Sequence, residues 1–361
     1  MRSDRAAPTG VAGAVDGVLR HGDGLARRGF LRGRPGPDLR WLSWADREDA
    51  TARLASKPAI FHARERLGPE PMAKLFERAA KPLAARDTPG CWLAGRRLVA
   101  IDGTCLDLAD TPANDEHFGR PGVSKGERSA FPQARVVALG ECGTHAMFDG
   151  VIGPYTTTEN ALARELLGRL TKEMLCLADR GFYSFEAWQR ATETGADLLW
   201  RVKSTLGLGP VRELPDGSWL AEVFHSTNDK RREHPITVRV IEYTIEDGRE
   251  ATGPYRLLTT ILDHRRAPAV DLAAAYAQRW EIETAFDELK THQRGPRAVL
   301  RSKSPVLVAQ EIWGHLCCHY AIRTLMFDAA AHAGRDPDRV SFVAALRIAR
   351  RSIAQAGAFP P

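Results

Sequence analysis

The segment 276–290 constrains the fold of this chain more than any other, because it carries two interleaved helical patterns. Polar side chains recur there at steps of three or four residues, which return to the same side of an α-helix. They are Tyr276, Arg279, Glu283, Asp287 and Lys290. Apolar side chains follow the neighbouring face, where they would pack into a core, and these are Ala275, Ile282, Phe286 and Leu289. The sequence therefore predicts a helix that is buried on one face and presents ionisable groups on the next.

The polar face of this helix combines carboxylate, cationic and phenolic groups. Such a set suits a metal ion beside a phosphodiester better than it suits plain solvation. A charged helical stripe usually only faces water, however, so the helix alone leaves both interpretations open.

The spacing Tyr-x2-Arg-x3-Glu-x6-Lys in this segment resembles the signature of the IS4 family of insertion-sequence transposases. Members of that family carry two further aspartates, at the ends of the first and fourth core strands. This chain has Asp102 after the apolar run 98–101 and Asp179 after the run 174–178. The three motifs occur in the family's order, and the resemblance extends over about residues 55–330.

The resemblance implies a catalytic triad of Asp102, Asp179 and Glu283. These residues would hold two divalent cations, which would be Mg²⁺, with Mn²⁺ as a substitute. Phosphodiester cleavage needs an activated water or 3′-hydroxyl and a stabilised leaving oxyanion, and two cations about 3.5–4 Å apart provide both. Mg²⁺ prefers hard oxygen ligands, so carboxylates suffice without cysteine or histidine. Asp102 would bridge both ions, and the other two residues would each complete one.

Basic side chains near the triad are the expected DNA contacts. The resemblance implies that Tyr276, Arg279 and Lys290 hold phosphates of the transferred strand. Further candidates for DNA binding are Lys203, Arg294 and Arg301. A basic run is usually a solvated face, but beside a carboxylate triad phosphate binding is the better interpretation.

The segments around the two aspartates predict alternating strands and helices. A strand over 92–101 would stop at Asp102, the segment 110–119 resembles the family's connecting hairpin, and the apolar runs 134–140 and 145–152 would pair antiparallel. A helix, a strand, a helix and a strand would follow, at residues 159–170, 174–178, 185–194 and 197–202. This pattern alone supports a mixed α/β domain, and the resemblance implies a ribonuclease-H-like catalytic core with a β-strand insertion.

Changes in composition divide the chain further. The N-terminal segment is rich in Gly, Arg and Pro, so we expect it to be disordered or a truncated form of the helical domain that reads transposon ends in relatives. The predicted divisions are the N-terminal segment 1–45, a helical region 46–90, the catalytic core 91–203 and 264–335, the β insertion 204–263, and a C-terminal helix and tail 336–361.

Composition argues against several other classes of protein. The formal net charge of +6 favours a polyanionic partner only weakly, and the six cysteines include no C-x2-C pair that would indicate a zinc ribbon. His315, Cys318 and His319 share a helical turn, but they lie in the apolar run 312–325, so core packing is favoured over zinc. No apolar run approaches the ~20 residues of a membrane span. We therefore expect a cytoplasmic, nucleoid-associated protein with no membrane partner.

The sequence as a whole favours a cut-and-paste DNA transposase. It would cleave double-stranded DNA at insertion-sequence ends and transfer the strand into target DNA, as a homodimer across paired ends. Two alternatives stay open: another ribonuclease-H-like endonuclease, and a decayed transposase copy that binds DNA without transposing.

Overall fold

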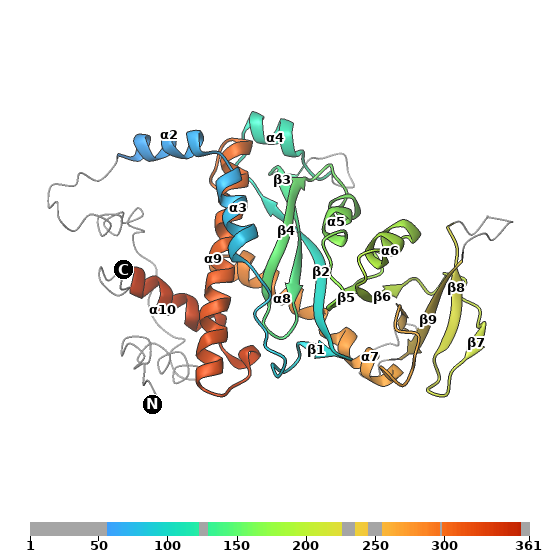
Figure 1. Ribbon diagram of the computed structural model, residues 1–361. Helices are drawn as coiled ribbons and strands as arrows, with labels where there is room; N and C mark the ends of the chain where they lie inside the picture. Colours follow the sequence, from blue (N-terminus) through green and yellow to red (C-terminus); the bar gives the residue numbers. More distant parts are fainter. Residues whose placement is uncertain (1–55, 123–128, 226–234, 245–254, 297, 355–361) are drawn as a thin grey trace, which may run out of the picture.

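The fold is built around one mixed β-sheet (Figure 1). The computed structural model describes residues 56–122, 129–225, 235–244, 255–296 and 298–354, so the expected N-terminal segment 1–45 lies outside the described residues. Strands in the described residues are β1 (Trp92–Leu93), β2 (Arg96–Asp107), β3 (Gln133–Glu141), β4 (Ala146–Pro154), β5 (Met174–Ala178), β6 (Asp197–Val202), β7 (Arg212–Glu213), β8 (Trp219–Val223), β9 (Ile236–Tyr243) and β10 (Tyr255–Thr259). Their order across the sheet is β4-β3-β2-β5-β6-β10-β9-β8-β7, with β1 paired to β2.

The first part of the sheet has the order that the sequence predicts. Strands β2, β3 and β4 form an antiparallel meander, whereas β5 and β6 run parallel to β2. Every residue of β5 is buried, as expected for a central parallel strand that is covered on both faces. The ribonuclease-H-like fold class is confirmed.

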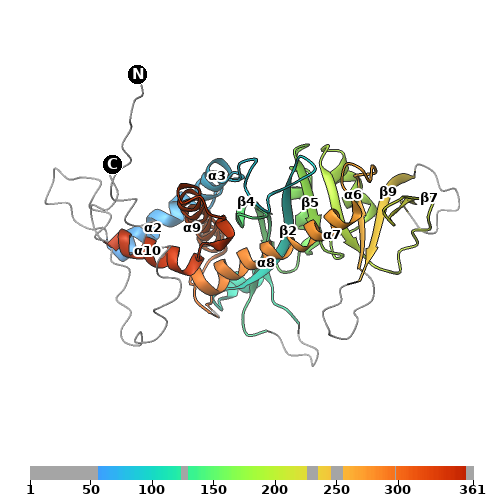
Figure 2. The ribbon, with the colours of Figure 1, turned by 90° about the horizontal axis from the view of Figure 1, so that it is seen from below.

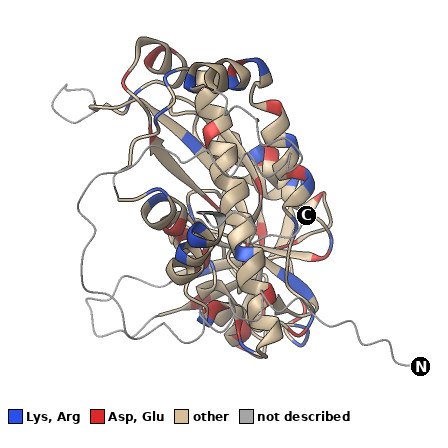
Figure 3. Ribbon diagram, turned by 90° about the vertical axis from the view of Figure 1, so that its left-hand side faces the viewer, with Lys and Arg blue, Asp and Glu red and all other residues tan. Residues whose placement is uncertain are grey.

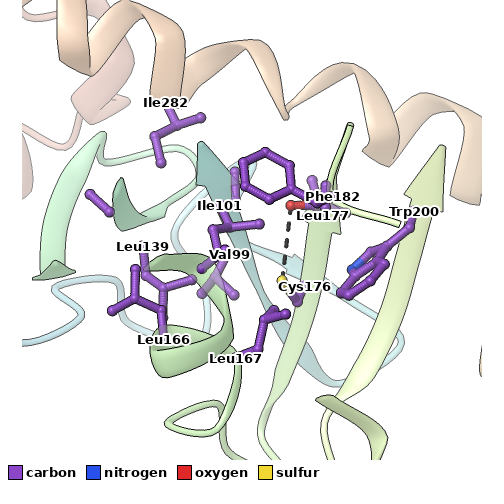
Figure 4. Packing of buried hydrophobic residues seen from close by; sticks show 14 of the residues in the cluster. Val99, Ile101, Leu139, Leu166, Leu167, Cys176, Leu177, Phe182, Trp200 and Ile282 are labelled. Carbon is purple, nitrogen blue, oxygen red and sulfur yellow. Dashed lines mark hydrogen bonds between the residues drawn. The ribbon is translucent and has the colours of Figure 1, made fainter. Parts of the chain in front are cut away.

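Helices cover both faces of this sheet. On one face lie α5 (Glu159–Leu167) and α6 (Phe185–Thr192), and on the other lie α7 (Ala269–Ala277) and α8 (Trp280–Asp287), which run across the strands in Figure 2. Figure 4 shows Ile282 of α8 on one side of β2, and Leu166 and Leu167 of α5 on the other. The apolar sides of both layers therefore share one core.

The remaining helices gather beside β4, at one edge of the sheet. The long helix α9 (Pro305–His332) contacts α3 (Glu70–Ala79), β4 and α10 (Phe342–Ala354), and α2 (Lys57–Leu67) precedes α3. Basic and acidic residues are interspersed on this side of the molecule (Figure 3). Of the helices in the described residues, none has the length and apolarity that crossing a membrane requires.

The predicted β insertion, residues 204–263, continues the central sheet. Strand β10 pairs antiparallel with β6, in the register Arg256↔Val202, and β9, β8 and β7 follow outward in order. Residues 226–234 and 245–254 of this segment lie outside the described residues. The described strands thus form one continuous sheet with the core.

Two local predictions were wrong. Strand β2 does not stop at Asp102 but runs on to Asp107, because β3 still pairs with it there although its pairing with β5 ends at Ala100. The expected hairpin at 110–119 is instead the helix α4 (Pro112–Phe118). The hydroxyl of Thr111 accepts a hydrogen bond from the backbone of the first turn, and proline fits the first helical position, so local capping favours a helix.

The prediction of one helix over 276–290 was also wrong. Helix α7 ends at Ala277 and α8 begins at Trp280, because at Gln278 and Arg279 the backbone N–H groups bond to carbonyls three residues back. A π-helical turn, Glu288–Gln293, then follows α8. The predicted apolar stripe is nevertheless buried, at Ala275, Ile282, Phe286 and Leu289.

Candidate active site

The two aspartates of the predicted triad lie side by side where the pairing of β2 with β5 ends, at the carboxyl end of β5. This end of the parallel strands is the carboxylate edge. Strands β2 and β5 are parallel neighbours with Ala100 opposite Leu177, so Asp102 and Asp179 each lie two residues beyond this pair. The side chain of Asp179 faces Arg201 of the next strand, with 3.8 Å between Oδ1 and Nη1. Parallel strands thus bring together carboxylates that are far apart in the sequence.

Arg279 joins Glu283 to this edge. Its Nη2 donates to Oε1 of Glu283 at 2.8 Å, and its Nη1 lies 3.8 Å from Oδ2 of Asp102. The guanidinium is buried, lies over the Trp280 ring and leaves Nε without a hydrogen-bond partner in the described residues. The break before α8 therefore places a buried cation between two predicted catalytic carboxylates.

The electrostatic surroundings of Asp102 disfavour its negative charge. Burial raises the pKa of this carboxyl to about 6, and the charges of Glu159 and Glu283 act in the same direction. A hydrogen bond from the Gly103 N–H, at 2.8 Å, and the charge of Arg279 oppose the rise. Additional positive charge at this edge would therefore stabilise the ionised form.

The predicted DNA-binding residues differ in exposure. Tyr276 is buried, its hydroxyl donates to the Ala178 carbonyl at 3.4 Å, and burial raises the pKa of the phenol, which stays neutral. Lys290 is exposed in the π-helical turn, and its Nζ donates to Oγ1 of Thr104 at 3.0 Å. Thr104 shares a strand face with Asp102, so this lysine lies along the carboxylate edge.

The other predicted basic contacts lie in loops. Lys203 is exposed directly after β6, and Arg301 is exposed before α9, with its backbone N–H bonded to Glu311. Arg294 is half-buried, donates to the Ala298 carbonyl and has a pKa lowered by burial. DNA contact by these residues, and by Tyr276, stays a prediction.

The residues at this edge fit a divalent cation by their chemistry. Asp102, Asp179 and Glu283 offer only carboxylate oxygens, the donors that Mg²⁺ prefers. In the part of the chain that the structure describes, no three Asp, Glu, His or Cys side chains lie close enough together to form a preformed metal-binding site. These three residues would hold such an ion, and Arg279 supplies positive charge beside two of them.

Sequence reasoning missed two features near the site. Glu159 begins α5, and its carboxylate lies against Gly103, beside Asp102. The sequence signal that could have identified Glu159 was its position, at the start of the helix that follows the third core strand. A buried polar cluster close to Lys290 is formed by Glu288, Arg323 and His319. The sequence signal for this cluster was the charged residue Arg323 inside an apolar helix. Core packing was predicted for His315, Cys318 and His319, but only His319 is buried, whereas His315 is half-buried and Cys318 is exposed.

A groove of about 1010 Å³ lies away from this site, between α3, α9 and the β4 edge. Phe76, Phe148 and Trp313 contribute apolar walls, and none of the predicted site residues lines it. The carboxylate edge is instead partly open, since the side chain of Glu283 is 41% exposed. An open edge suits a polymeric substrate better than an enclosed small molecule.

Comparison with known proteins identifies the family of the chain. Residues 93–321 match the transposase DDE domain family. The chain is 32% identical over 294 residues to the transposase InsG for insertion sequence element IS4 from Escherichia coli, covering 79% of this chain and 64% of that protein. It is 30% identical over 163 residues to the putative transposase InsZ of the same organism, covering 45% and 54%.

Among solved structures, the piggyBac transposase synaptic complex with hairpin DNA is similar with a TM-score of 0.43 and 14% identity, covering 71% of this chain and 52% of that one. The chain spans less than two thirds of the length of both curated relatives. The family match covers more than half of the chain and contains the three predicted carboxylates. The chain therefore belongs to the transposase DDE domain family.

Proposed function

We propose that this chain is a DNA transposase that cleaves phosphodiester bonds at insertion-sequence ends and joins the released strand to target DNA. The observation that carries the proposal is the placement of Asp102, Asp179 and Glu283 at one open edge of a ribonuclease-H-like sheet, in a chain of the DDE family. Cut-and-paste transposition by a homodimer on paired ends is the form of the reaction that the resemblance to IS4-type relatives supports.

The proposed chemistry divides among the residues at this edge. Two divalent cations, when bound, make a water or a 3′-hydroxyl nucleophilic and stabilise the leaving oxyanion. Asp102, Asp179 and Glu283 would hold them, and Asp102 would lie between the other two, because β2 pairs with β5 on one side and Asp102 lies near the Arg279–Glu283 pair on the other. Arg279 stays fixed by Glu283, and its guanidinium adds positive charge beside the carboxylates for a phosphate that approaches them. Lys290 adds an exposed positive charge beside Thr104, which lies two residues after Asp102 on β2.

The proposal is tested on a labelled duplex that carries the DNA ends flanking this gene, with Mg²⁺ or Mn²⁺. The wild-type chain is expected to nick the duplex and to give hairpin or joined products, whereas Asp102→Asn is expected to bind the duplex without cleaving it. Cleavage without joined products would favour a ribonuclease-H-like endonuclease instead. Binding without cleavage by both proteins would favour a decayed copy and contradict the proposal.

Lys290→Ala is expected to weaken DNA binding and to lower the salt dependence of the association constant by about one counterion, because one phosphate contact is lost. The measurement is a fluorescence titration of labelled duplex at several salt concentrations. Lys172→Ala is the matched control. Lys172 is exposed, but it precedes β5 and so lies at the opposite end of this strand from Asp179. An unchanged salt slope for Lys290→Ala would exclude the phosphate contact.

A further inference from the structure

We propose that Glu159 is a fourth carboxylate of the divalent-cation site, beside Asp102 and Asp179. This inference rests on the proposed function, because it adds a residue to the same site. It reaches beyond the three acidic residues of the family signature, since Glu159 lies on α5, an element that contributes none of them.

The geometry at Gly103 brings Glu159 to the catalytic edge. A Cβ atom at position 103 would lie 2.0 Å from Oε1 of Glu159 and 2.9 Å from its Cδ. The carboxylate therefore fills the space that any side chain at 103 would take. Successive residues of a strand face opposite sides of the sheet, so Glu159 approaches the β2 backbone from the α5 side and Asp102 faces the α8 side. Glycine directly after Asp102 thus permits a carboxylate from the second face to reach this edge.

The carboxylate of Glu159 has no hydrogen-bond donor or ion-pair partner within the described part of the chain. Burial raises its pKa, the charge of Arg135 opposes the rise, and the charge of Asp179 adds to it. The charge of Arg135 offsets part of the cost of a half-buried carboxylate that lacks a donor and faces other carboxylates, and a divalent cation would stabilise it further. The same hard oxygen chemistry that suits Asp102 to Mg²⁺ applies to Glu159.

The simpler role for Glu159 is helix stabilisation, because a carboxylate in the first turn interacts favourably with the helix dipole. The backbone of this turn is already capped by the hydroxyl of Thr158, which accepts from the Ala161 N–H at 3.3 Å. A role confined to the helix does not require the carboxylate to lie on Gly103. The two roles predict different outcomes for metal binding, which can be measured without DNA and without turnover.

The test is a titration of the full chain with Mn²⁺, with free Mn²⁺ followed by electron paramagnetic resonance. Glu159→Gln is expected to weaken Mn²⁺ binding by about 10-fold or more. Asp102→Asn is the positive control. Glu165→Gln is the matched negative control, since Glu165 lies on the same helix, is exposed and pairs with Arg169, and it should bind Mn²⁺ as the wild type does.

Gly103→Ala gives a second variant that keeps the charge of Glu159. Position 103 lies inside β2, where alanine is accommodated by the backbone, but its Cβ would displace the Glu159 carboxylate. Gly103→Ala is therefore expected to weaken Mn²⁺ binding as well, and the double variant should lose less than the sum of the two effects.

The outcomes separate this inference from the proposed function. If Asp102→Asn weakens Mn²⁺ binding but Glu159→Gln does not, Glu159 only stabilises its helix, and the inference fails while the proposed function stands. If neither variant changes the binding of Mn²⁺, the carboxylate edge is not a metal site, and both proposals fail.

Discussion

Glu283→Gln is expected to lower the rate of metal-dependent DNA cleavage by about 10²- to 10³-fold, the effect of removing a preorganised charged group from a reacting centre. Glutamine keeps the size of the side chain and can still accept the hydrogen bond from Arg279, so the fold and DNA binding should persist. It removes the negative charge that a divalent cation requires. The measurement is single-turnover cleavage of labelled duplex at saturating protein, so that a loss in affinity is not counted as a loss in rate.

Asp287→Asn is the matched control for this substitution. Asp287 lies one turn further along α8, is exposed and accepts a hydrogen bond from Thr291. Loss of its charge should change the cleavage rate little, because it is not beside Asp102. A cleavage rate for Glu283→Gln equal to that of the control would show that Glu283 does not belong to the catalytic triad.

The strands of the core were predictable because their sequences are unambiguous. Residues 174–178 and 197–202 are short apolar runs bounded by polar turns, and the structure has β5 and β6 at these same limits. Where a strand ends depends on its pairing with neighbouring strands, which an apolar pattern does not record. Strand β2 continues past Asp102 because β3 supplies a partner, and no local feature of the sequence records that partner.

The residues of the candidate site could be named from the sequence, but their geometry could not. The spacing of Arg279 and Glu283 suits any helix, so it could not reveal the break that buries the arginine between two carboxylates. Glu159 reaches Gly103, the residue after Asp102, only because Gly103 lacks a side chain, and this is a contact between separate elements. Helical periodicity describes one element at a time, whereas a catalytic edge depends on how several elements meet.

The polar cluster behind Lys290 shows the same limit at a buried position. Glu288, at 6% exposure, accepts hydrogen bonds from Nε of Arg323 at 2.9 Å and from Nε2 of His319 at 3.0 Å. Arg323, at 3% exposure, also contacts His145. In the sequence, His319 and Arg323 interrupt an apolar helix without any local partner. Only the fold shows that the π-helical turn supplies Glu288.

Glu288→Ala is expected to destabilise the chain by about 3–5 kcal/mol, because it leaves the buried charge of Arg323 without its carboxylate. Urea unfolding of the full chain, followed by fluorescence, measures the free energy of unfolding. Glu165→Ala is the control, since Glu165 pairs with Arg169 at the surface and its loss should cost no more than about 1 kcal/mol. Replacing Glu288 and Arg323 together by leucine should cost less than the sum of the two single replacements.

The effect of Glu288→Ala should also depend on pH. Burial raises the pKa of Glu288, but the hydrogen bond from His319 and the charge of Arg323 outweigh it and leave the pKa below its ordinary value of 4.5. The ion cluster therefore contributes its full stability above pH 4.5, and this contribution is lost as the pH falls through the lowered pKa. The difference in unfolding free energy between wild type and Glu288→Ala should accordingly shrink in acid. A difference that is small at neutral pH, or that grows in acid, would contradict a stabilising ion pair between Glu288 and Arg323.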